Sequence, residues 1–584
     1  MYNCLMKASH LIWNTQFGEA KEYITPLIHI PRMAYELATM DIIASNLSGE
    51  TSVRENSLKG IEVAENALKQ VGHSTEEILK IVAEYKQLNS EIENEKYYSI
   101  SEMSHSNFME LDQMGKEQIL FNFELDHMVL DAETHMMRGI IQFYSGSYLK
   151  GFYNLRRSYL RFKEVYNIVE QFKDETTHSP KFIHSDVIHN AYFGIGIFNF
   201  MLSILPPTLT QILSLIGFDA DRDHGLNLLR KVHEYGGRQC AFASFMLAMN
   251  YLFIPRALED REKKLLEGGL ILDRSNKVFT KSGLFKFMTS HYERKRGNIS
   301  SAVENLKDAI DICQKSMGIA PNILRHELSW CYLLTLNFQD ASVVLEEILN
   351  TDKEFDTKGI SAMMLAVCRI KTGDKEGTNS IINNFSKYIS KTGRLDKYAL
   401  EKSEILKHLP TENERHLMMF ISVFQFLYLK RDLANLSEQY AEPLYRLFVD
   451  ICDQVKIDDK SKLAGDIEAG LLVVKGQFLK QMNKYEESIE QFKRALLFEH
   501  KIRYEKQWIA FPYYEVGELI YLYQVPQAAN DHTKLELLQC VKQYFEKCNN
   551  YHRYSFEEVL HSRVKLALRQ VESDLKNVKN KMNL

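Results

Sequence analysis

Two glycines open the stretch of this chain that comes nearest to a nucleotide-binding motif. The segment "GIGIFN", from Gly194 to Asn199, begins like the fingerprint in which glycines let a dinucleotide phosphate approach a helix N-terminus. Asn199 stands where the third glycine of that fingerprint belongs, and no strand pattern precedes the segment. Close packing of two helices at Gly194 and Gly196 explains the glycines better. We therefore expect no nucleotide there.

A second segment contains half of a zinc motif. In "RHELSWC", His326 and Glu327 match the first half of H-E-x-x-H, in which two histidines one helical turn apart bind the metal. Ser329 and Trp330 occupy the following positions, and the second histidine is missing. We interpret the segment as the polar face of a repeat helix.

A third segment brings imidazoles near a carboxylate. In "HSDVIHN", His184 and His189 flank Asp186, but no third metal ligand lies nearby in the sequence. A helix N-terminus explains these residues better, because serine and aspartate side chains accept hydrogen bonds from the first free backbone N–H groups of a helix. We expect Ser185 or Asp186 to be the capping residue.

No other stretch supplies the residues of a known catalytic centre. The chain has no G-x-S-x-G elbow, no Walker loop and no C-x-x-C pair. Its eight cysteines are scattered, which is typical of small buried hydrophobic side chains in a reducing compartment. We therefore predict that the protein is not an enzyme and has no catalytic residue, no cofactor and no metal.

The net charge and the N-terminal residues indicate which class of partner and which compartment to expect. The formal net charge is −5, whereas a surface that binds nucleic acid normally shows a basic excess. The opening "MYNCLMKASHLIW" lacks the basic and apolar regions of a secretory signal. We predict a cytoplasmic protein that binds no nucleic acid and whose partner is another protein.

The composition favours helices as the elements that position these residues. Only 27 of 584 residues are glycine and 11 are proline, both below ordinary usage. No sustained alternation of apolar and polar residues indicates strands. The length exceeds that of a single compact core, so it fits several domains or one extended array.

The clearest repeat unit is "LLVVKGQFLKQMNKYEESIEQFKRALLFEH", at residues 471–500. It consists of an apolar helix, a short polar turn and a second amphipathic helix, and its spacing matches the 34-residue tetratricopeptide pattern. Gly476 lies at a small-residue position that lets the paired helices approach closely, while Phe492 and Ala495 fill the space between them.

Other units repeat this outline with more variation. Their small or apolar marker positions are Leu11, Ala20 and Ile24; Gly139, Gly151, Leu155 and Ser158; Ala302, Leu306 and Ala309; Ala341, Leu345 and Ile348; and Gly377 and Ile381. Together the units predict an all-α solenoid of tetratricopeptide-like helix hairpins with an atypical N-terminal half.

The sequence predicts two regions in this solenoid. Residues 1–240 form an atypical N-terminal helical region with degenerate repeats, and residues 241–584 form a tetratricopeptide-like array. An amphipathic helix over 554–580 is expected to cap the array. The polar stretch 88–114 is predicted to be a loop between helices.

One long stretch, residues 190–218, has no Asp, Glu, Lys or Arg. Pro206 and Pro207 divide it, because proline cannot continue a helix. The first arm, from Ala191 to Leu205, is about 22 Å long at ~1.5 Å per residue, which is too short for a bilayer core of ~30 Å. We predict a buried apolar hairpin over 190–218. The alternative is a membrane-attached protein that uses this segment.

With these pieces in order, the chain resembles the tetratricopeptide-repeat 39 family, which is related to fungal inclusion-body-clearance proteins. The most specific similarity lies in "FGIGIFNFMLSILPPTLTQILSLIGFDADRDHGLNLL". It looks like that family's signature of a glycine-rich helix, an Asn, S-x-L-P, x-x-x-G-F and D-x-G-L. The matching positions are Gly194, Gly196, Asn199, Ser203, Leu205, Pro206, Gly217, Phe218, Asp223, Gly225 and Leu226. The similarity extends over almost the whole chain.

The resemblance implies a non-enzymatic adaptor associated with lipid or sterol homeostasis or with lipid-droplet-linked clearance of aggregates. One branch of the family is associated with ubiquitin-dependent turnover of a nuclear receptor. The family has also been labelled an outer-mitochondrial-membrane group, so the resemblance implies contact with that membrane or with lipid droplets. It carries no catalytic residue over to this chain.

A partner-binding surface is expected where aromatic residues lie on the first helices of the repeats. Such arrays usually bind on the concave surface that these helices form, and aromatic side chains anchor interfaces well. The expected anchors are Tyr292, Trp330, Tyr332, Tyr513 and Tyr514. The alternative is that these side chains pack between repeats.

Overall fold

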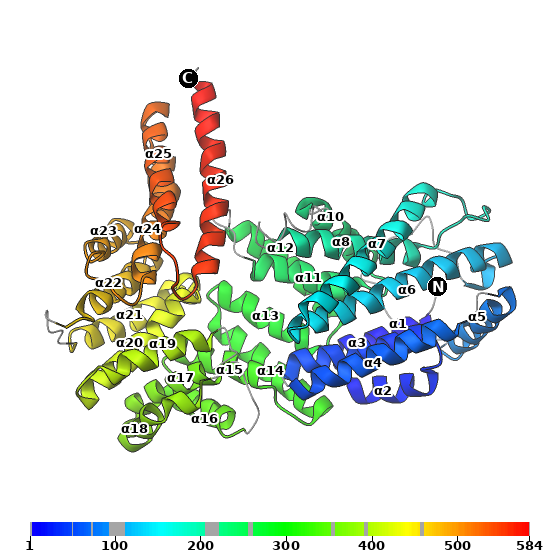
Figure 1. The fold of residues 1–584 in the computed structure, drawn as a ribbon, viewed down its shortest axis with the longest axis horizontal. Coiled ribbons are helices and arrows are strands. Elements are labelled where there is room, and N and C mark those ends of the chain that lie inside the picture. Colours follow the sequence, from blue (N-terminus) through cyan, green and yellow to red (C-terminus); the bar gives the residue numbers. More distant parts are fainter. Residues whose placement is uncertain are drawn as a thin grey trace. The chain divides into compact units, whose positions relative to one another are not determined.

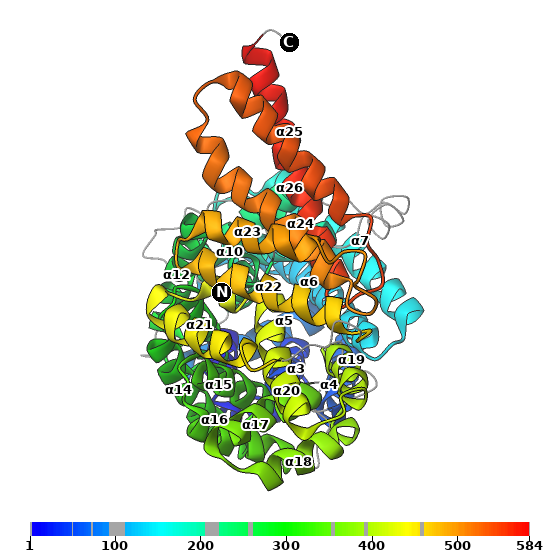
Figure 2. The same ribbon diagram turned by 90° about the vertical axis from the view of Figure 1, so that its left-hand side faces the viewer.

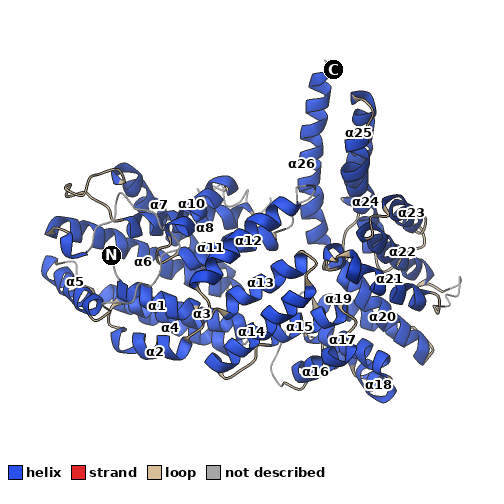
Figure 3. Cartoon of the chain, turned by 180° about the vertical axis from the view of Figure 1, so that it is seen from behind, coloured by secondary structure: helices blue, strands red, loops and turns tan. Residues whose placement is uncertain are grey.

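The fold is helical along the described chain (Figure 1). The computed structural model describes residues 3–48, 51–71, 74–92, 111–204, 221–254, 258, 261–351, 357–389, 395–455 and 461–582. Within these ranges all regular elements are helices, and no strand is present (Figure 3). The all-α class predicted from the scarcity of glycine and proline is confirmed.

The contacts of the chain separate it into two compact units. Unit 1 comprises residues 1–251, 266–289 and 305–324, and unit 2 comprises residues 252–265, 290–304 and 325–584. This grouping does not test the predicted division into 1–240 and 241–584, which stays a prediction.

Unit 1 is built mainly from the first half of the chain. Its helices are α1 (Asn3–Trp13), α2 (Phe17–Ile24), α3 (Pro31–Ser48), α4 (Thr51–Gln70), α5 (Thr75–Ser90), α6 (Lys116–Tyr144), α7 (Tyr148–Phe172), α8 (Ser185–Ser203), α10 (Arg222–Tyr235) and α11 (Cys240–Leu252). The last residue of α11, Leu252, belongs to unit 2, and the next four helices also contain residues of both units: α12 (Arg261–Val278), α13 (Gly283–Lys295), α14 (Ile299–Met317) and α15 (Asn322–Leu334).

Unit 2 contains the rest of the chain. Its helices are α16 (Phe338–Leu349), α17 (Lys358–Thr372), α18 (Lys375–Asn383), α19 (Asp396–Lys407), α20 (Glu412–Leu429), α21 (Glu438–Cys452), α22 (Ala464–Gln481), α23 (Tyr485–Leu496), α24 (Gln507–Leu519), α25 (Asp531–Cys548) and α26 (Glu557–Lys581). Consecutive helices from α22 to α26 pack against each other, and α25 lies beside α26 in both Figure 1 and Figure 2.

A common turn joins the helices of several hairpins. In each case three residues separate the two helices, and the middle one has a left-handed backbone. These middle residues are Thr15, Gly146, Gly297, Leu336 and Asn483. After each of them, the next backbone N–H bonds the carbonyl five residues earlier, as from Lys484 to Leu479 at 2.9 Å. This bond satisfies a free carbonyl at the end of the first helix and turns the chain back.

The hairpin of α22 and α23 confirms the clearest repeat unit of the sequence. A side chain at Gly476 would lie 2.9 Å from the ring of Phe492, so only glycine allows this approach. Ser488 donates a hydrogen bond to the Gly476 carbonyl at 2.7 Å, and Phe492 and Ala495 are fully buried. The small residues therefore bring the helices together, and the larger ones fill the space.

The hairpin of α6 and α7 follows the same rule in unit 1. A side chain at Gly139 would lie 2.8 Å from Leu155, and Ser158 donates to the Ala132 carbonyl at 2.6 Å. Beside this hairpin, α3, α4 and α6 enclose an apolar core. Its buried members are Ala34, Tyr35, Ala38, Ile61, Ala64, Ala67, Leu68, Leu130, Met137 and Ile141.

The first arm of the uncharged stretch is part of α8. Nearly every residue from Asn190 to Phe200 is buried, and α8 packs against α6, α7 and α10. Within the described residues, no helix combines the length and the apolar character that crossing a bilayer requires. The second arm, with Pro206, Gly217 and Phe218, lies outside the described residues, so the complete hairpin over 190–218 stays a prediction.

Two other expected elements are also present in part. The predicted loop over 88–114 begins later than expected, because α5 continues to Ser90. A short 3-10 turn forms at Leu111–Gln113, and residues 93–110 lie outside the described part. The expected terminal helix is α26, which starts at Glu557. Its role as a cap of the array stays a prediction.

Candidate functional site

The glycine-rich segment of α8 is a packing site. A side chain at Gly194 would overlap the ring of Phe162 in α7, and one at Gly196 would lie 3.2 Å from the Gly225 carbonyl in α10. A side chain at Gly225 would in turn lie 2.8 Å from the Phe200 backbone nitrogen. The three glycines therefore let α8 approach both neighbouring helices, as the sequence predicted for Gly194 and Gly196.

Asn199 connects the same helices through hydrogen bonds. Its side-chain amide donates to the Ile195 carbonyl at 3.0 Å, and its side-chain oxygen accepts from the Asp221 backbone N–H at 3.1 Å. Asp221 then caps α10 by accepting from the His224 N–H at 2.9 Å. Asn199, at the third-glycine position of the nucleotide fingerprint, thus fixes the start of α10.

The segment around His184 is a helix start, but its capping residue differs from the expected one. The N-cap of α8 is His184, whose Nδ1 accepts from the Asp186 backbone N–H at 3.1 Å. Ser185 is already the first helical residue, so the expectation of a cap by Ser185 or Asp186 is wrong. The imidazole replaces the usual short side chain because its ring nitrogen reaches the same free N–H group.

His326 belongs to a buried hydrogen-bonded group in unit 2. Trp330 Nε1 donates to His326 Nε2 at 2.9 Å, and His326 Nδ1 lies 2.9 Å from the Ser361 hydroxyl. Burial lowers the pKa of His326 to about 3, and the nearby Lys430 contributes in the same direction. The neutral imidazole therefore serves as a hydrogen-bonding link between α15 and α17.

Glu327 is paired with cations rather than available as a base. Its carboxylate lies 2.6 Å from Arg294 and 3.0 Å from Lys430. Burial alone would raise the pKa of Glu327, but these two cations hold that pKa well below its ordinary value. The segment expected to be the polar face of a repeat helix is therefore a buried ionic contact.

The five expected anchors differ in exposure. Trp330 and Tyr514 are fully buried, Tyr332 and Tyr513 are almost fully buried, and Tyr292 is partly exposed. Trp330 stacks on Phe426 with ring centres 5.5 Å apart. These contacts describe packing inside unit 2. Whether any of the five contacts a partner stays a prediction.

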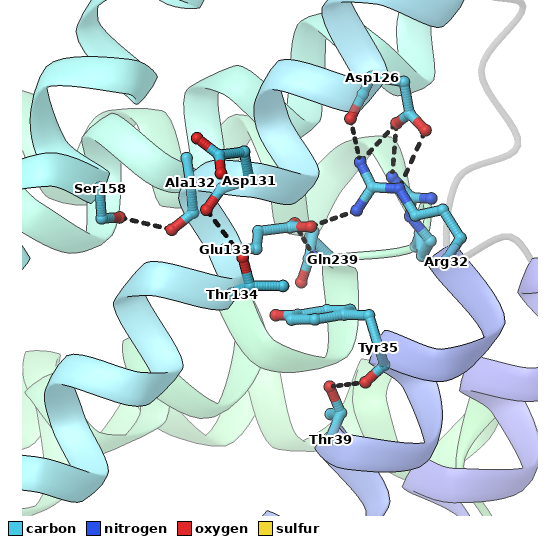
Figure 4. Close-up of polar contacts among 11 residues, drawn as sticks. Arg32, Tyr35, Thr39, Asp126, Asp131, Ala132, Glu133, Thr134, Ser158 and Gln239 are labelled. Atoms are coloured by element: carbon cyan, nitrogen blue, oxygen red, sulfur yellow. Dashed lines mark hydrogen bonds and ion pairs between the residues drawn. The ribbon is translucent and has the colours of Figure 1, made fainter. Parts of the chain in front are cut away.

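Unit 1 contains a buried ionic cluster centred on Arg32 (Figure 4). Arg32 comes from α3 and donates to both carboxylate oxygens of Asp126 in α6, at 2.6 and 2.9 Å, and also to Glu133 of α6. Gln239 donates to the other oxygen of Glu133 at 2.6 Å, and Arg238 lies 3.2 Å from Asp126. The cluster therefore joins α3 and α6 to the segment between α10 and α11.

The charges of this cluster are buried and paired, which is typical of a group that stabilises the fold. Burial alone would raise the pKa of Asp126, but Arg32 and Arg238 outweigh it and lower that pKa. Glu36 lies in the same environment, and burial raises its pKa to about 7 although Arg238 opposes the rise. Removing one partner of such a buried pair costs about 3–5 kcal/mol, since the other charge stays buried.

The most exposed apolar side chains of unit 1 lie at the start of α7. Leu149 is 88% exposed, Tyr153 66% and Tyr148 64%. Lys150 and Arg156 are exposed beside them, and no ion pair to either is found within the described residues. We call these five residues the α7 surface. Exposed apolar side chains that lie together and are rimmed by polar residues are typical of interaction surfaces.

A hollow adjoins the α7 surface and has a well-fixed floor. Its volume is about 370 Å³, and it is lined by Arg138, Gln142, Leu149, Lys150, Tyr153 and Asn154. Asn154 donates to Gln142 at 2.8 Å, and Arg138 forms a two-point ion pair with Glu65 at 2.7 and 3.0 Å. Hydrogen bonds and an ion pair therefore hold the floor in place, while Leu149 and Tyr153 at its rim face water.

The fold and these contacts define the class of protein as a tetratricopeptide-like helical-repeat protein. The chain belongs to the Iml2/tetratricopeptide repeat protein 39 family, whose model matches residues 56–417. The family resemblance predicted from the sequence is confirmed. This fold indicates a protein-interaction scaffold, because helical-repeat arrays typically bind other proteins.

Solved helical structures also match this chain, at low identity. They include the human IFIT1 dimer with PPP-AAAA (13% identity, covering 85% of this chain and 94% of that chain, TM-score 0.30). Another is the APC/C hetero-tetramer Cut9-Hcn1 (10% identity, 95% and 94% covered, TM-score 0.24). At these TM-scores, the likeness carries no further argument.

Two features of the site were not identified from the sequence. Leu149 and Tyr153 are four residues apart, which places them on one helix face, but this spacing does not say whether the face is buried. Arg32 and Glu133 are about a hundred residues apart, and nothing in a single sequence pairs them. The sequence feature that could have revealed the α7 surface is a second apolar stripe on a helix that already had one.

Proposed function

We propose that this protein is an interaction scaffold that docks an acidic protein segment bearing apolar side chains on the α7 surface. The observation that carries the proposal is the exposure of Leu149 and Tyr153 beside the unpaired cations of Lys150 and Arg156 in the described structure. The apolar side chains would gain from burial, and the two cations select a segment of negative charge.

The geometry supports a segment rather than a small ligand. The hollow of about 370 Å³ is shallow and wide open to solvent, and Leu149 and Tyr153 at its rim belong to the exposed stripe of α7. Tyrosine anchors of this kind contribute much of the binding energy at interfaces because they bury a large area with few rotatable bonds. Asn154 in the floor is already held by two hydrogen bonds, which reduces the entropy lost when the segment binds.

A display library of random 16-residue peptides, selected on the full-length chain, tests the proposal. We expect the selected peptides to be enriched in Asp, Glu and large apolar residues. They should bind at least tenfold more weakly to the double variant Leu149→Asp, Tyr153→Asp. Aspartate at position 149 is compatible with the fold, since acidic residues are favourable in the first turn of a helix.

Two controls distinguish specific docking from non-specific peptide binding. Leu266→Asp changes another exposed leucine of unit 1 and should leave peptide binding unchanged. Lys150→Glu with Arg156→Glu should shift the selection toward basic peptides. Peptides without acidic enrichment, or equal binding to the double variant, would refute the proposal. Self-association of the chain that disappears in that variant would instead make a second copy the occupant.

The cellular role is the finer part of the same proposal. From the family resemblance we propose action in lipid homeostasis or in the clearance of aggregates, in the cytoplasm at lipid droplets or at the mitochondrial outer membrane. A fluorescently tagged full-length chain should gather on one of these structures in cells, and the double variant of Leu149 and Tyr153 should stay diffuse. A wild-type chain that is diffuse after both lipid loading and heat-induced aggregation would contradict this role.

A further inference from the structure

Two imidazoles and a carboxylate meet where α26 begins. His552 Nδ1 lies 2.9 Å from Glu557 Oε1, and His561 Nδ1 lies 3.8 Å from the same oxygen. One nitrogen or oxygen atom from each of the three side chains lies within 4.8 Å of the others. The ring centres of His552 and His561 are 5.3 Å apart, and the rings are nearly perpendicular.

The local backbone creates this arrangement. Glu557 and His561 are four residues apart in α26 and so lie on one face of the helix, one turn apart. His552 precedes the helix and returns to that face because Arg553 and Phe556 both have left-handed backbones, with φ of 66° and 65°. Three side chains that could ligate a metal are thus brought together from one short segment.

Neighbouring groups hold two of the three side chains in place. The Arg553 backbone N–H donates to Glu557 Oε2 at 2.6 Å, which leaves Oε1 facing the imidazoles. The Tyr554 hydroxyl, on a buried side chain, lies 3.3 Å from His561 Nε2, which leaves Nδ1 facing Glu557. Contacts of this kind orient ligands in metal sites by bonding the atom that the metal does not use.

We propose that His552, Glu557 and His561 bind a divalent transition metal ion of the zinc type. Two imidazoles and one carboxylate form a known zinc ligand set, which leaves a fourth position for water. Ligands at ~2.0–2.2 Å from a tetrahedral ion are about 3.4 Å from each other. The present separations of 2.9 and 3.8 Å from Glu557 Oε1 bracket that value, and the two imidazole nitrogens lie within 4.8 Å of each other, so the three atoms must draw together around the ion. The bound ion would fasten the segment after α25 to the first turn of α26.

Cobalt(II) serves as a coloured probe of this site on the full-length chain. We expect one equivalent of Co²⁺ to give the visible bands of a tetrahedral complex with nitrogen and oxygen ligands, without a thiolate charge-transfer band. Zn²⁺ should remove these bands by displacement. Hydrogen exchange in peptides over 549–561 should slow at least tenfold when Zn²⁺ is bound.

Single substitutions separate this site from non-specific binding. His552→Ala and His561→Ala should each weaken Co²⁺ binding at least tenfold, with the helical circular-dichroism signal unchanged. His532→Ala is the matched control, because His532 faces Glu536 at 3.4 Å on α25 with no third ligand in the described structure, and this variant should bind normally. Absence of stoichiometric binding, retention of the bands in both site variants, or their loss in the control would overturn the proposal.

Discussion

Replacing Gly194 by alanine tests how α8 is held against α7. The new methyl group would come closer than 3.0 Å to the buried ring of Phe162, whereas ordinary contact begins at 3.4 Å. Since Phe162 is fully buried and packs edge-on against Phe198, its ring must move on the order of 1 Å into a filled core. Overpacking of this kind costs about 1–3 kcal/mol, and the better helix propensity of alanine returns about 0.5–1 kcal/mol. Because the overlap with the ring is severe, we place the cost in the upper part of that range and expect a net loss of about 1–2 kcal/mol.

Hydrogen exchange read by mass spectrometry measures this loss locally. A local readout is needed because a chain with two compact units does not have a single two-state unfolding free energy. Under conditions in which exchange reports the opening equilibrium, peptides of α7 and α8 should exchange roughly 5–30 times faster in the Gly194→Ala variant. Peptides of unit 2 should be unchanged.

A double-mutant cycle attributes the loss to one contact. In a Phe162→Leu background the ring is absent, so Gly194→Ala should cost less than about 0.5 kcal/mol, and the difference between backgrounds is the coupling energy. Gly18→Ala is the control, because Gly18 is helical, nothing lies near its Cβ position, and alanine should stabilise α2 by about 0.5–1 kcal/mol. An equal loss in both backgrounds, or no loss at all, would refute the reasoning.

Three further predictions follow from single residues. Gly373 has a φ of 83° with open space around it, so Gly373→Ala should lower the stability of the α17–α18 hairpin by about 1 kcal/mol in hydrogen exchange. Burial raises the pKa of Glu36 from 4.5 to about 7, so its carboxyl favours the folded state below pH 4.5 and costs stability as the pH rises through 7. Glu36→Gln should therefore stabilise unit 1 by up to about 3 kcal/mol at pH 8 and by little at pH 4.5, as measured by hydrogen exchange in peptides of α3 and α6 at both pH values, corrected for the pH dependence of intrinsic exchange. Burial raises the pKa of Cys331 to about 11, whereas Cys540 is the half-buried thiol, so a disulfide reagent at pH 8 should label Cys540 first.

The repeats were predictable because residues that lie close together in the sequence determine their geometry. Gly476 and Phe492 pack against each other across a three-residue turn, and a helix hairpin of fixed length always brings these positions together. The same holds for Gly139 and Leu155 in α6 and α7. Local spacing fixes such contacts whatever the rest of the chain does.

Contacts across long sequence distances were not predictable by this route. Arg32 pairs with Asp126 through the packing of α3 on α6, and Lys430 meets Glu327 although about a hundred residues separate them. A charged residue in an amphipathic helix is ordinarily expected in water, and its burial depends on a partner that a single sequence does not reveal. The prediction of the N-cap residue of α8 was wrong for a related reason. Histidine is not among the usual capping residues, and only the three-dimensional structure shows that the ring nitrogen of His184 reaches the free N–H group.

The α7 surface was predictable only in part. Gly151, Leu155 and Ser158 form the stripe that packs on α6, whereas Leu149 and Tyr153 lie two residues earlier in each turn, about 200° around the helix. A helix with apolar residues on two opposite faces needs two neighbours. Phe162 lies on the first of these faces, seven residues after Leu155, so its contact with α8 does not cover the second face. On the second face, Leu160 follows Tyr153 by seven residues and is 44% exposed, so the stripe stays uncovered along α7 in the described structure. This uncovered stripe is the physical basis for expecting another chain to take that place.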